Sequence, residues 1–398
     1  MIIEGRTLDV LIRKILNKTL IGGVKRLLLN FPPPYEIKKQ LIQAGGDEKM
    51  PVFIFPLPST PWGYLFQRPQ QFAKTLSAMG YPVIYCVDTS FPGEPDFSIR
   101  GLQQIQEQLY LFNDGYNGET LEVLAERAVI WQYWPNQYPI VKKGPWKAHI
   151  YDCIDHLSTF QPDRHLVELH AQSLEEADIV LASASLIEEE LLAVRKDVLL
   201  VENAVNPEDF TCNQSSDNVL SLKLEELTAS YSSVVGYYGA IAEWMDLDLI
   251  TYCADKNPDH LFLLVGQKYP GIKIPTRPNI VRLDRISYES LPTLLSFIDV
   301  CIVPFLINEI TMHTSPVKLF EYLAAGKAVV STCLPEVLKY PIVYTADTKQ
   351  KFEQYLHVAI RQGKLPEYQA SAQLTARMNS WQIRAQKVID KLKHKKLI

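Results

Sequence analysis

The chain has 398 residues, of which 47% are hydrophobic and 21% charged, and its net charge at pH 7 is −5. A chain of this length is too long for one domain with a single hydrophobic core and is typical of two domains. The negative net charge gives no support for a nucleic-acid partner. No run approaches the roughly 18 consecutive apolar residues of a membrane span, and six cysteines without CxxC spacing fit a reducing cytoplasm.

The first thirty residues are basic, with six Lys or Arg against two acidic side chains and hence a net charge of +4. Residues 7–29 alternate apolar and basic positions at roughly helical spacing. Such a helix either lies on an anionic membrane surface or packs on its own protein, and both interpretations stay open. Residues 32–49, which begin with three prolines, predict a linker, so we assign 1–49 to an extension and linker.

A first domain is expected over 50–210. It opens with a buried strand at 51–55, a helix at 70–79 and a second strand at 83–87, which is the start of a doubly wound α/β domain. The absence of GxGxxG after the first strand speaks against a dinucleotide oxidoreductase. The intervening loop either packs on itself or meets a ligand through Trp62, Gly63, Tyr64 and Arg68.

Later strands of this domain are predicted at 129–134, 149–156 and 179–182, whereas 88–127 predict mostly loop. The strand at 149–156 ends in polar side chains. At the carboxyl end of a parallel strand such residues are either site candidates or caps of the next helix. The candidates are Asp152, Asp155 and His156.

A second domain is expected over 211–375 and repeats the strand–helix–strand rhythm. A strand at 234–239 enters a turn at Gly239 and Ala240, and a strand at 261–265 ends at Gly266. Glycines there would let a diphosphate approach the backbone closely. A further strand is predicted at 279–286, and a last helix begins near Trp381 with Ser380 as N-cap.

The strongest motif is SPVKLFEYLAAG at 315–326, which lies between two apolar strands. Ser315 suits an N-cap and Pro316 the first helical position. A lysine in the first turn opposes the helix dipole unless an anion binds there too. In one interpretation Lys318 and the amides near Val317 hold a diphosphate while Glu321 binds a ribose; in the other, Lys318 and Glu321 form a solvated surface pair.

The run SPVKLFEYLAAGKAVVST resembles the donor-nucleotide motif of GT-B glycosyltransferases near glycosyltransferase family 4. The resemblance implies α/β architecture with two doubly wound Rossmann-like domains facing across a cleft, and a C-terminal helix at 376–398 that crosses back to the first domain. Glu321 matches the glutamate that holds the ribose in that family. The sequence departs from the family pattern at other positions: His313 replaces a glutamate, Ala204 a hinge glycine, and Glu243, Trp244 and Asp246 stand where Arg and Lys are usual.

The resemblance further implies a glycosyltransferase that takes a nucleotide sugar, with UDP- and GDP-sugars expected first, and transfers the sugar to a glycan or lipid-linked acceptor in surface polysaccharide synthesis. The acceptor would meet the 58–69 loop, and the enzyme would retain anomeric configuration and need no metal or other cofactor. An inverting enzyme would need Asp155, Asp152 or His156 as base. The residues implied in donor binding are Gly239, Ala240, Gly266, Arg285, Ile286, His313, Ser315, Pro316, Val317, Lys318 and Glu321.

Two rivals stay open alongside this hypothesis. One is a nucleotide-sugar epimerase of the same shape. The other is a non-catalytic module that binds a nucleotide sugar or glycan, which the changes at His313, Glu243 and Asp246 would fit.

Overall fold

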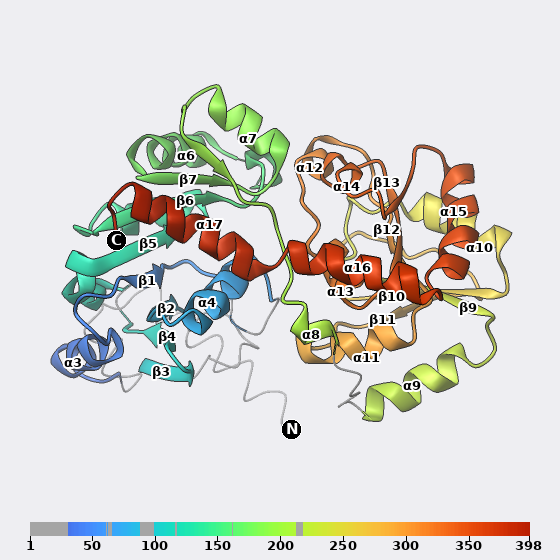
Figure 1. The fold of residues 1–398 in the computed structure, drawn as a ribbon, viewed down its shortest axis with the longest axis horizontal. Helices are drawn as coiled ribbons and strands as arrows, with labels where there is room; N and C mark the ends of the chain where they lie inside the picture. The colour runs from blue at the N-terminus through green and yellow to red at the C-terminus, as the bar shows by residue number, and fades with distance from the viewer. Residues whose placement is uncertain are drawn as a thin grey trace.

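The computed structural model describes residues 31–60, 62, 66–87, 99–115, 118–160, 162–211 and 218–398. The basic helix predicted at 7–29 and the candidate acceptor residues Gly63 and Tyr64 therefore lie outside the described residues. Two α/β units lie side by side, each with a sheet between layers of helices, and the chain passes from one unit to the other near residue 205 and returns near residue 380 (Figure 1).

In the described part of the chain, the first unit contains an eight-stranded sheet with the order β3-β4-β2-β1-β5-β6-β7-β8. Its strands are β1 (Val52–Phe55), β2 (Val83–Cys86), β3 (Gly101–Gln106), β4 (Leu109–Asn113), β5 (Ala128–Gln132), β6 (Ala148–Cys153), β7 (Ile179–Ala182) and β8 (Val198–Leu200). All neighbours pair in parallel except β3 and β4. The central strands are buried on both faces, as their continuous apolar runs predict.

The helices of this unit are α3 (Pro34–Ala44), α4 (Arg68–Ala78), α5 (Tyr138–Val141), α6 (Arg164–Glu176) and α7 (Ser185–Leu192), with 3-10 turns η1 (Glu119–Arg127), η2 (Pro135–Gln137) and η3 (Leu157–Phe160). Two sequence predictions were wrong here. The stretch predicted as a linker contains α3, which buries Ile37 and Leu41 in the first unit because these side chains recur at i and i+4 on one face. The stretch predicted as mostly loop contributes β3, β4 and η1.

The second unit contains a six-stranded sheet with the order β11-β10-β9-β12-β13-β14, parallel throughout in the described residues. Its strands are β9 (Ser233–Tyr238), β10 (His260–Val265), β11 (Ile280–Leu283), β12 (Val300–Val303), β13 (Ala328–Thr332) and β14 (Tyr344–Ala346). Its helices are α8 (Glu208–Thr211), α9 (Asn218–Thr228), α10 (Leu247–Lys256), α11 (Leu291–Ser296), α12 (Glu309–Met312), α13 (Val317–Ala324), α14 (Pro335–Leu338), α15 (Lys349–Gln362) and α16 (Pro366–Met378), with η4 at Tyr288–Ser290. No helix in the described ranges is both long and apolar enough to cross a bilayer.

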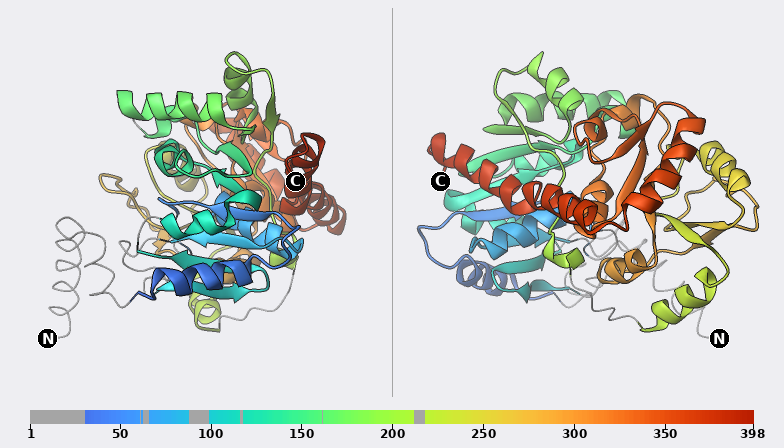
Figure 2. Two further views of the ribbon diagram at one scale, coloured as in Figure 1. Left: turned by 90° about the vertical axis from the view of Figure 1, so that its left-hand side faces the viewer. Right: turned by 45° about the vertical axis from the view of Figure 1, so that its right-hand side comes forward.

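The last helix, α17 (Trp381–His394), returns to the first unit, as predicted, and lies against α4 (Figures 1 and 2). The Ser380 side chain accepts a hydrogen bond from the Ile383 amide, which confirms the predicted N-cap. Trp381 is fully buried beside Phe72 of α4 in the core of the first unit. Val205 and Ser380 form a parallel bridge, so the outgoing and returning segments run next to each other.

Candidate functional site

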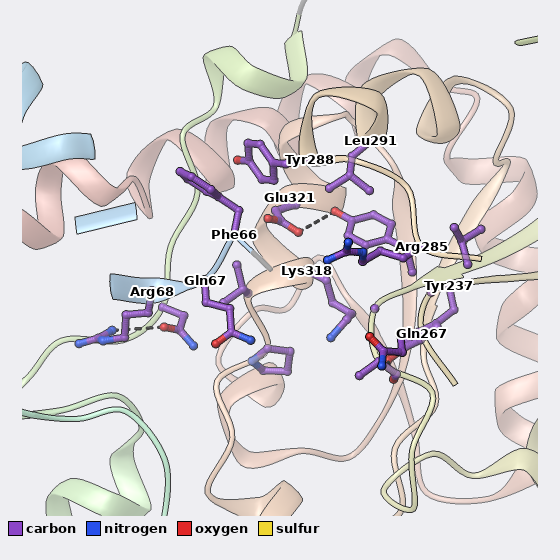
Figure 3. Close-up of a pocket in the computed structure, with 18 of the residues that line it drawn as sticks. Phe66, Gln67, Arg68, Tyr237, Gln267, Arg285, Tyr288, Leu291, Lys318 and Glu321 are labelled. Carbon is purple, nitrogen blue, oxygen red and sulfur yellow. Dashed lines mark hydrogen bonds between the residues drawn. The ribbon is translucent and has the colours of Figure 1, made fainter. Parts of the chain in front are cut away.

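A cleft of about 520 Å³ lies between the two units and takes its lining from both. The first unit contributes residues before and at the start of α4, after β6 and after β8, namely Phe66, Gln67, Arg68, Ile154, Asp155 and Asn203. The second unit contributes the turns that follow its strands and the start of α13 (Figure 3). The carboxyl ends of parallel strands thus face the cleft, which is where α/β sheets bind ligands.

Two glycine turns form the backbone wall of this cleft. Gly239 follows β9 with φ +131 and Gly266 follows β10 with φ +148, values that L side chains rarely adopt. A side chain at Gly266 would overlap the Gly239 carbonyl, and a Cβ at Gly239 would lie 3.0 Å from Cε of Lys318. Backbone is therefore exposed to the cleft where the sequence predicted close approach of a ligand.

The N-terminus of α13 also lines the cleft, but the helix begins at Val317, one residue later than predicted. Its N-cap is Pro316 and no side chain caps it, so the predicted role of Ser315 as N-cap was wrong. Ser315 instead presents its backbone carbonyl to the first unit, where it accepts a hydrogen bond of 2.6 Å from Nδ2 of Asn203. Ser315, Pro316, Val317 and Lys318 all line the cleft, so the uncapped first turn is available to an anion.

Glu321 is buried and Lys318 is half-buried, which contradicts the interpretation as a solvated surface pair. Glu321 is only 5% exposed and accepts a hydrogen bond of 2.7 Å from the Tyr238 hydroxyl. Burial raises the pKa of Glu321 to about 7, against the opposing effects of Tyr238 and Lys318. Burial also lowers the pKa of Lys318 to about 8, although Glu321 acts in the other direction.

The Lys318 ammonium lies over two aromatic rings, 5.1 Å from the Phe305 centroid and 5.5 Å from that of Tyr237. Tyr237 belongs to β9 and Phe305 follows β12, so both rings come from the second unit. They hold the Lys318 side chain close to Gly239. A half-buried cation next to bare backbone and an uncapped helix start is an arrangement that suits an anion.

Similarity to known proteins fits this geometry. No family model matches the chain. It is 29% identical over 243 residues to TuaH of Bacillus subtilis (strain 168), which is named as a candidate teichuronic acid biosynthesis glycosyltransferase, and the match spans 55% of this chain and 59% of that protein. The chain thus covers less than two thirds of the length of that relative.

Solved structures match over almost the whole length. Anabaena HepE in complex with UDP and glucose has a TM-score of 0.63 at 14% identity, covering 87% of this chain and 100% of that one. Sucrose-phosphate synthase from Thermosynechococcus elongatus has a TM-score of 0.61 at 14% identity, covering 87% and 99%. An Escherichia coli trehalose-6-phosphate protein bound to UDP-2-fluoro glucose has a TM-score of 0.62 at 9% identity, covering 86% and 99%. The chain has the GT-B fold.

Two of the candidate bases that this GT-B chain carries in its first unit, Asp152 and His156, do not reach the cleft as expected. Asp152 is buried at 1% exposure, where its carboxylate accepts from the Arg68 guanidinium at 2.8 Å and from Trp131 Nε1 at 3.0 Å. It does not line the cleft, so it is not placed to act as a base. His156 does not line it either and pairs with Glu190 at 3.2 Å.

His313 was predicted to bind the donor because of its position in the motif, but its side chain turns away from the cleft to Oε1 of Glu190, at 3.0 Å. The reason is that α12 places it beside α7 of the first unit. Asp155, in contrast, lines the cleft, and burial raises its pKa to about 6 against the effect of Arg68.

Arg68, a predicted acceptor residue, lines the cleft but is occupied by other groups. Besides its pair with Asp152, its Nη1 donates to Oδ1 of Asn203 at 3.3 Å. Since Asn203 in turn donates to Ser315, Arg68 connects the buried Asp152 to the segment before α13. This arrangement supports a positioning role for Arg68. The sequence alone could not predict that role, because the residues that Arg68 connects are far apart in the chain.

Other cleft residues were not predicted. Phe66 lies 5.0 Å from the Tyr288 ring across the two units, and the Tyr288 hydroxyl receives a hydrogen bond from Gln71 at 3.2 Å. The predicted loop residue Trp62 packs on Phe66 and Tyr85 and does not line the cleft. No sequence signal distinguishes these aromatic residues from ordinary loop packing.

The predicted residues at the second-unit wall are mostly placed as expected. Ala240, Arg285 and Ile286 line the cleft together with the two glycines. After the Gly239 turn, Trp244 lines the cleft, while Asp246 caps α10 by accepting from the Leu249 amide at 2.8 Å. Among the lining residues the cationic side chains are Arg68, Arg285 and Lys318.

Proposed function

We propose that this chain is a glycosyltransferase that transfers a sugar from a nucleotide-sugar donor to a glycan or lipid-linked acceptor in surface polysaccharide synthesis. The observation that carries the proposal is the half-buried Lys318 and the buried Glu321 in the uncapped first turns of α13, which line a GT-B cleft together with two glycine turns. The name of the TuaH relative supports both the reaction type and the polysaccharide pathway.

The donor we propose is a UDP-sugar. Anabaena HepE was solved with UDP-glucose and the E. coli neighbour with UDP-2-fluoro glucose, and both share the fold of this chain. In our proposal the diphosphate lies on the first-turn amides of α13 beside Lys318, and the ribose donates to Glu321. The base then lies toward Arg285 and Ile286, at the far wall of the cleft.

Catalysis would follow from the same groups. As the glycosidic bond to the diphosphate breaks, negative charge grows on the leaving phosphate, and the helix N-terminus and Lys318 stabilise that charge. Because both are fixed by the fold, they need no reorganisation during the reaction. The proposal requires neither a metal nor another cofactor.

The acceptor would enter from the first unit, past Phe66 and Gln67. We propose retention of anomeric configuration, which needs no protein base. If the enzyme inverts instead, Asp155 becomes the candidate base, because its carboxyl lines the cleft and its raised pKa suits proton uptake near neutrality. The proposed location is the cytoplasm, with the inner membrane face as an option if residues 1–30 bind anionic lipid.

Incubation of the purified chain with radiolabelled UDP- and GDP-sugars and a lipid-linked or glycan acceptor tests the proposal. Label in the acceptor fraction is the expected result. Epimerised nucleotide sugar without transfer would favour the epimerase alternative, and unchanged donor that stays bound would favour a binding module. The TuaH relative is named a transferase, which favours transfer.

A further inference from the structure

Two histidines and a glutamate from the two units meet where the units contact each other, and none of the three lines the cleft. His156 lies in the loop after β6, Glu190 on α7, and His313 directly after α12. The ligand atoms of the three side chains all lie within 4.8 Å of one another. They come from positions 34 and 123 residues apart, so only the docking of the second unit on the first assembles them.

The hydrogen-bond pattern indicates that a cation belongs between these groups. Nδ1 of His313 lies 2.6 Å from the backbone carbonyl of Glu309, which only accepts, so Nδ1 carries a hydrogen. In the neutral ring Nε2 then presents a lone pair, and it faces Oε1 of Glu190 at 3.0 Å. Two facing acceptors repel each other unless a proton or a metal ion stands between them.

The donor set and spacing fit a metal. Zinc takes imidazole nitrogen and carboxylate oxygen at about 2.0–2.1 Å, which puts neighbouring ligand atoms of a tetrahedron roughly 3.3 Å apart. Nε2 of His313 and Nε2 of His156 lie 3.0 and 3.2 Å from the two Glu190 oxygens. The two rings are stacked with their centroids 4.3 Å apart, and both Nε2 atoms face the same carboxylate.

The surroundings also fit. Metal-bound histidines usually donate their other ring nitrogen to a carbonyl or similar acceptor, as His313 does to Glu309. The ring of His156 is oriented by Ser158, whose hydroxyl lies 2.7 Å from Nδ1 and whose amide donates to Nδ1 at 3.4 Å. The histidine side chains are 17% and 11% exposed, whereas Glu190 is 50% exposed, which leaves an entry path and a fourth position for water.

We propose that His156, Glu190 and His313 bind one divalent ion of the zinc class, which ties the two units together outside the cleft. The ion is separate from the proposed transfer chemistry, since none of its three ligands lines the cleft. Bound zinc would restrict separation of the units, because it holds ligands from both.

Zinc binding to the full chain tests this proposal after metal is stripped with a chelator. Two cysteines, the half-buried Cys333 and also Cys212, which lies outside the described residues, are replaced by serine so that thiolates do not compete. Isothermal titration with Zn²⁺ should show one equivalent per chain, and thermal unfolding should shift upward with zinc. Glu190→Gln, which keeps the shape of a half-exposed side chain, and His313→Ala should each weaken binding at least about tenfold and abolish the shift.

His357→Ala is the matched control, because His357 also pairs with a glutamate, Glu353, at 2.9 Å but belongs to no group of three close ligand atoms in the described residues. It should bind zinc like the parent chain. A parent chain that binds no zinc would leave a proton as the cation between His313 and Glu190 and overturn the proposal. Binding that is equal in the parent, Glu190→Gln and His313→Ala would mark adventitious surface binding and overturn it as well.

Discussion

The Tyr238 hydroxyl donates a hydrogen bond of 2.7 Å to Oε2 of Glu321, which joins the end of β9 to the inner face of α13. This hydrogen bond occupies Oε2, which leaves Oε1 for a ligand in the cleft that Glu321 lines. The bond also fixes the direction in which a ribose would have to approach. Glu321 is therefore both part of the buried structure and the proposed ligand contact.

Replacing Glu321 by glutamine should weaken UDP binding by about 10- to 150-fold, the equivalent of losing one charged hydrogen bond worth roughly 1.5–3 kcal/mol. Glutamine keeps an oxygen that can accept from Tyr238, so the fold should be retained, whereas alanine would leave that hydroxyl unpaired in the interior. Calorimetric titration with UDP measures the effect. Glu289→Gln, at an exposed glutamate that also lines the cleft, is the control, and equal affinities in both variants would remove Glu321 from the ribose site.

Lys318→Met should lower kcat by a larger factor than it lowers UDP affinity, because the phosphate gains charge as the sugar leaves. The methionine retains the apolar contact with the Tyr237 and Phe305 rings. Lys349→Met is a matched control, since the Lys349 ammonium lies 4.8 Å from the Tyr252 ring centroid but outside the cleft. Steady-state transfer rates and UDP titrations on both variants decide the matter. Equal losses of kcat and affinity would limit Lys318 to uniform binding.

UDP affinity should fall as the pH rises through about 8. Burial lowers the pKa of Lys318 to about 8 in the free chain, so the ammonium is progressively lost above that pH. A bound diphosphate favours the ammonium, so binding in this range takes up a proton and weakens by up to about tenfold per pH unit. Titrations in two buffers with different ionisation enthalpies report the proton uptake. A Lys318→Met variant with the same pH slope would assign the effect to another group.

The neighbouring aspartates Asp152 and Asp155 should respond oppositely to replacement by asparagine. Asp152→Asn leaves the buried Arg68 without a charged partner and should cost about 3–5 kcal/mol of unfolding free energy. Asp155 has a pKa raised to about 6 by burial, so its folded form holds a proton longer than the unfolded form. The stability that this proton contributes is complete below the unfolded pKa and is lost as the pH rises through about 6.

At pH 8, therefore, Asp155→Asn should be neutral or stabilising. Denaturant unfolding of both variants at pH 5 and pH 8 checks the contrast. If Asp155→Asn destabilised the chain at pH 8 as much as Asp152→Asn, the carboxylate would be a structural partner, and its candidacy as a base would end.

Residues 1–30 should carry any binding to anionic membranes. Their net charge of +4 predicts attraction of about 1 kcal/mol per basic residue near the surface, weakened by salt. The comparison chain should begin at Phe31, because α3 belongs to the first unit and the Phe31 ring lies 5.0 Å from the Arg100 guanidinium. Full-length protein should sediment with anionic vesicles at low salt and the shortened chain should not. Failure of both to sediment would favour packing of this segment on the protein.

Local patterns in the sequence predicted the features that depend on local chemistry. The strands flanking α13, the turns at Gly239 and Gly266, and the Ser380 cap all follow from residues close together in the chain. The helix α3 was missed because three prolines suggested a linker, although Ile37 and Leu41 form an apolar face. Pairing between distant residues, such as Arg68 with Asp152 or His313 with Glu190, could not be predicted, since it depends on how the units dock.

The return of α17 to the first unit has a consequence for the order of events during synthesis. Trp381, Val388 and Leu392 are fully buried in the core that also contains β1 and α4. The last of these residues leaves the ribosome only after the whole second unit has been made, although domains generally fold as they emerge. The core of the first unit is therefore completed only after α17 has been synthesised. A nascent chain stalled before Trp381 would expose to chaperones the apolar surface that α17 covers.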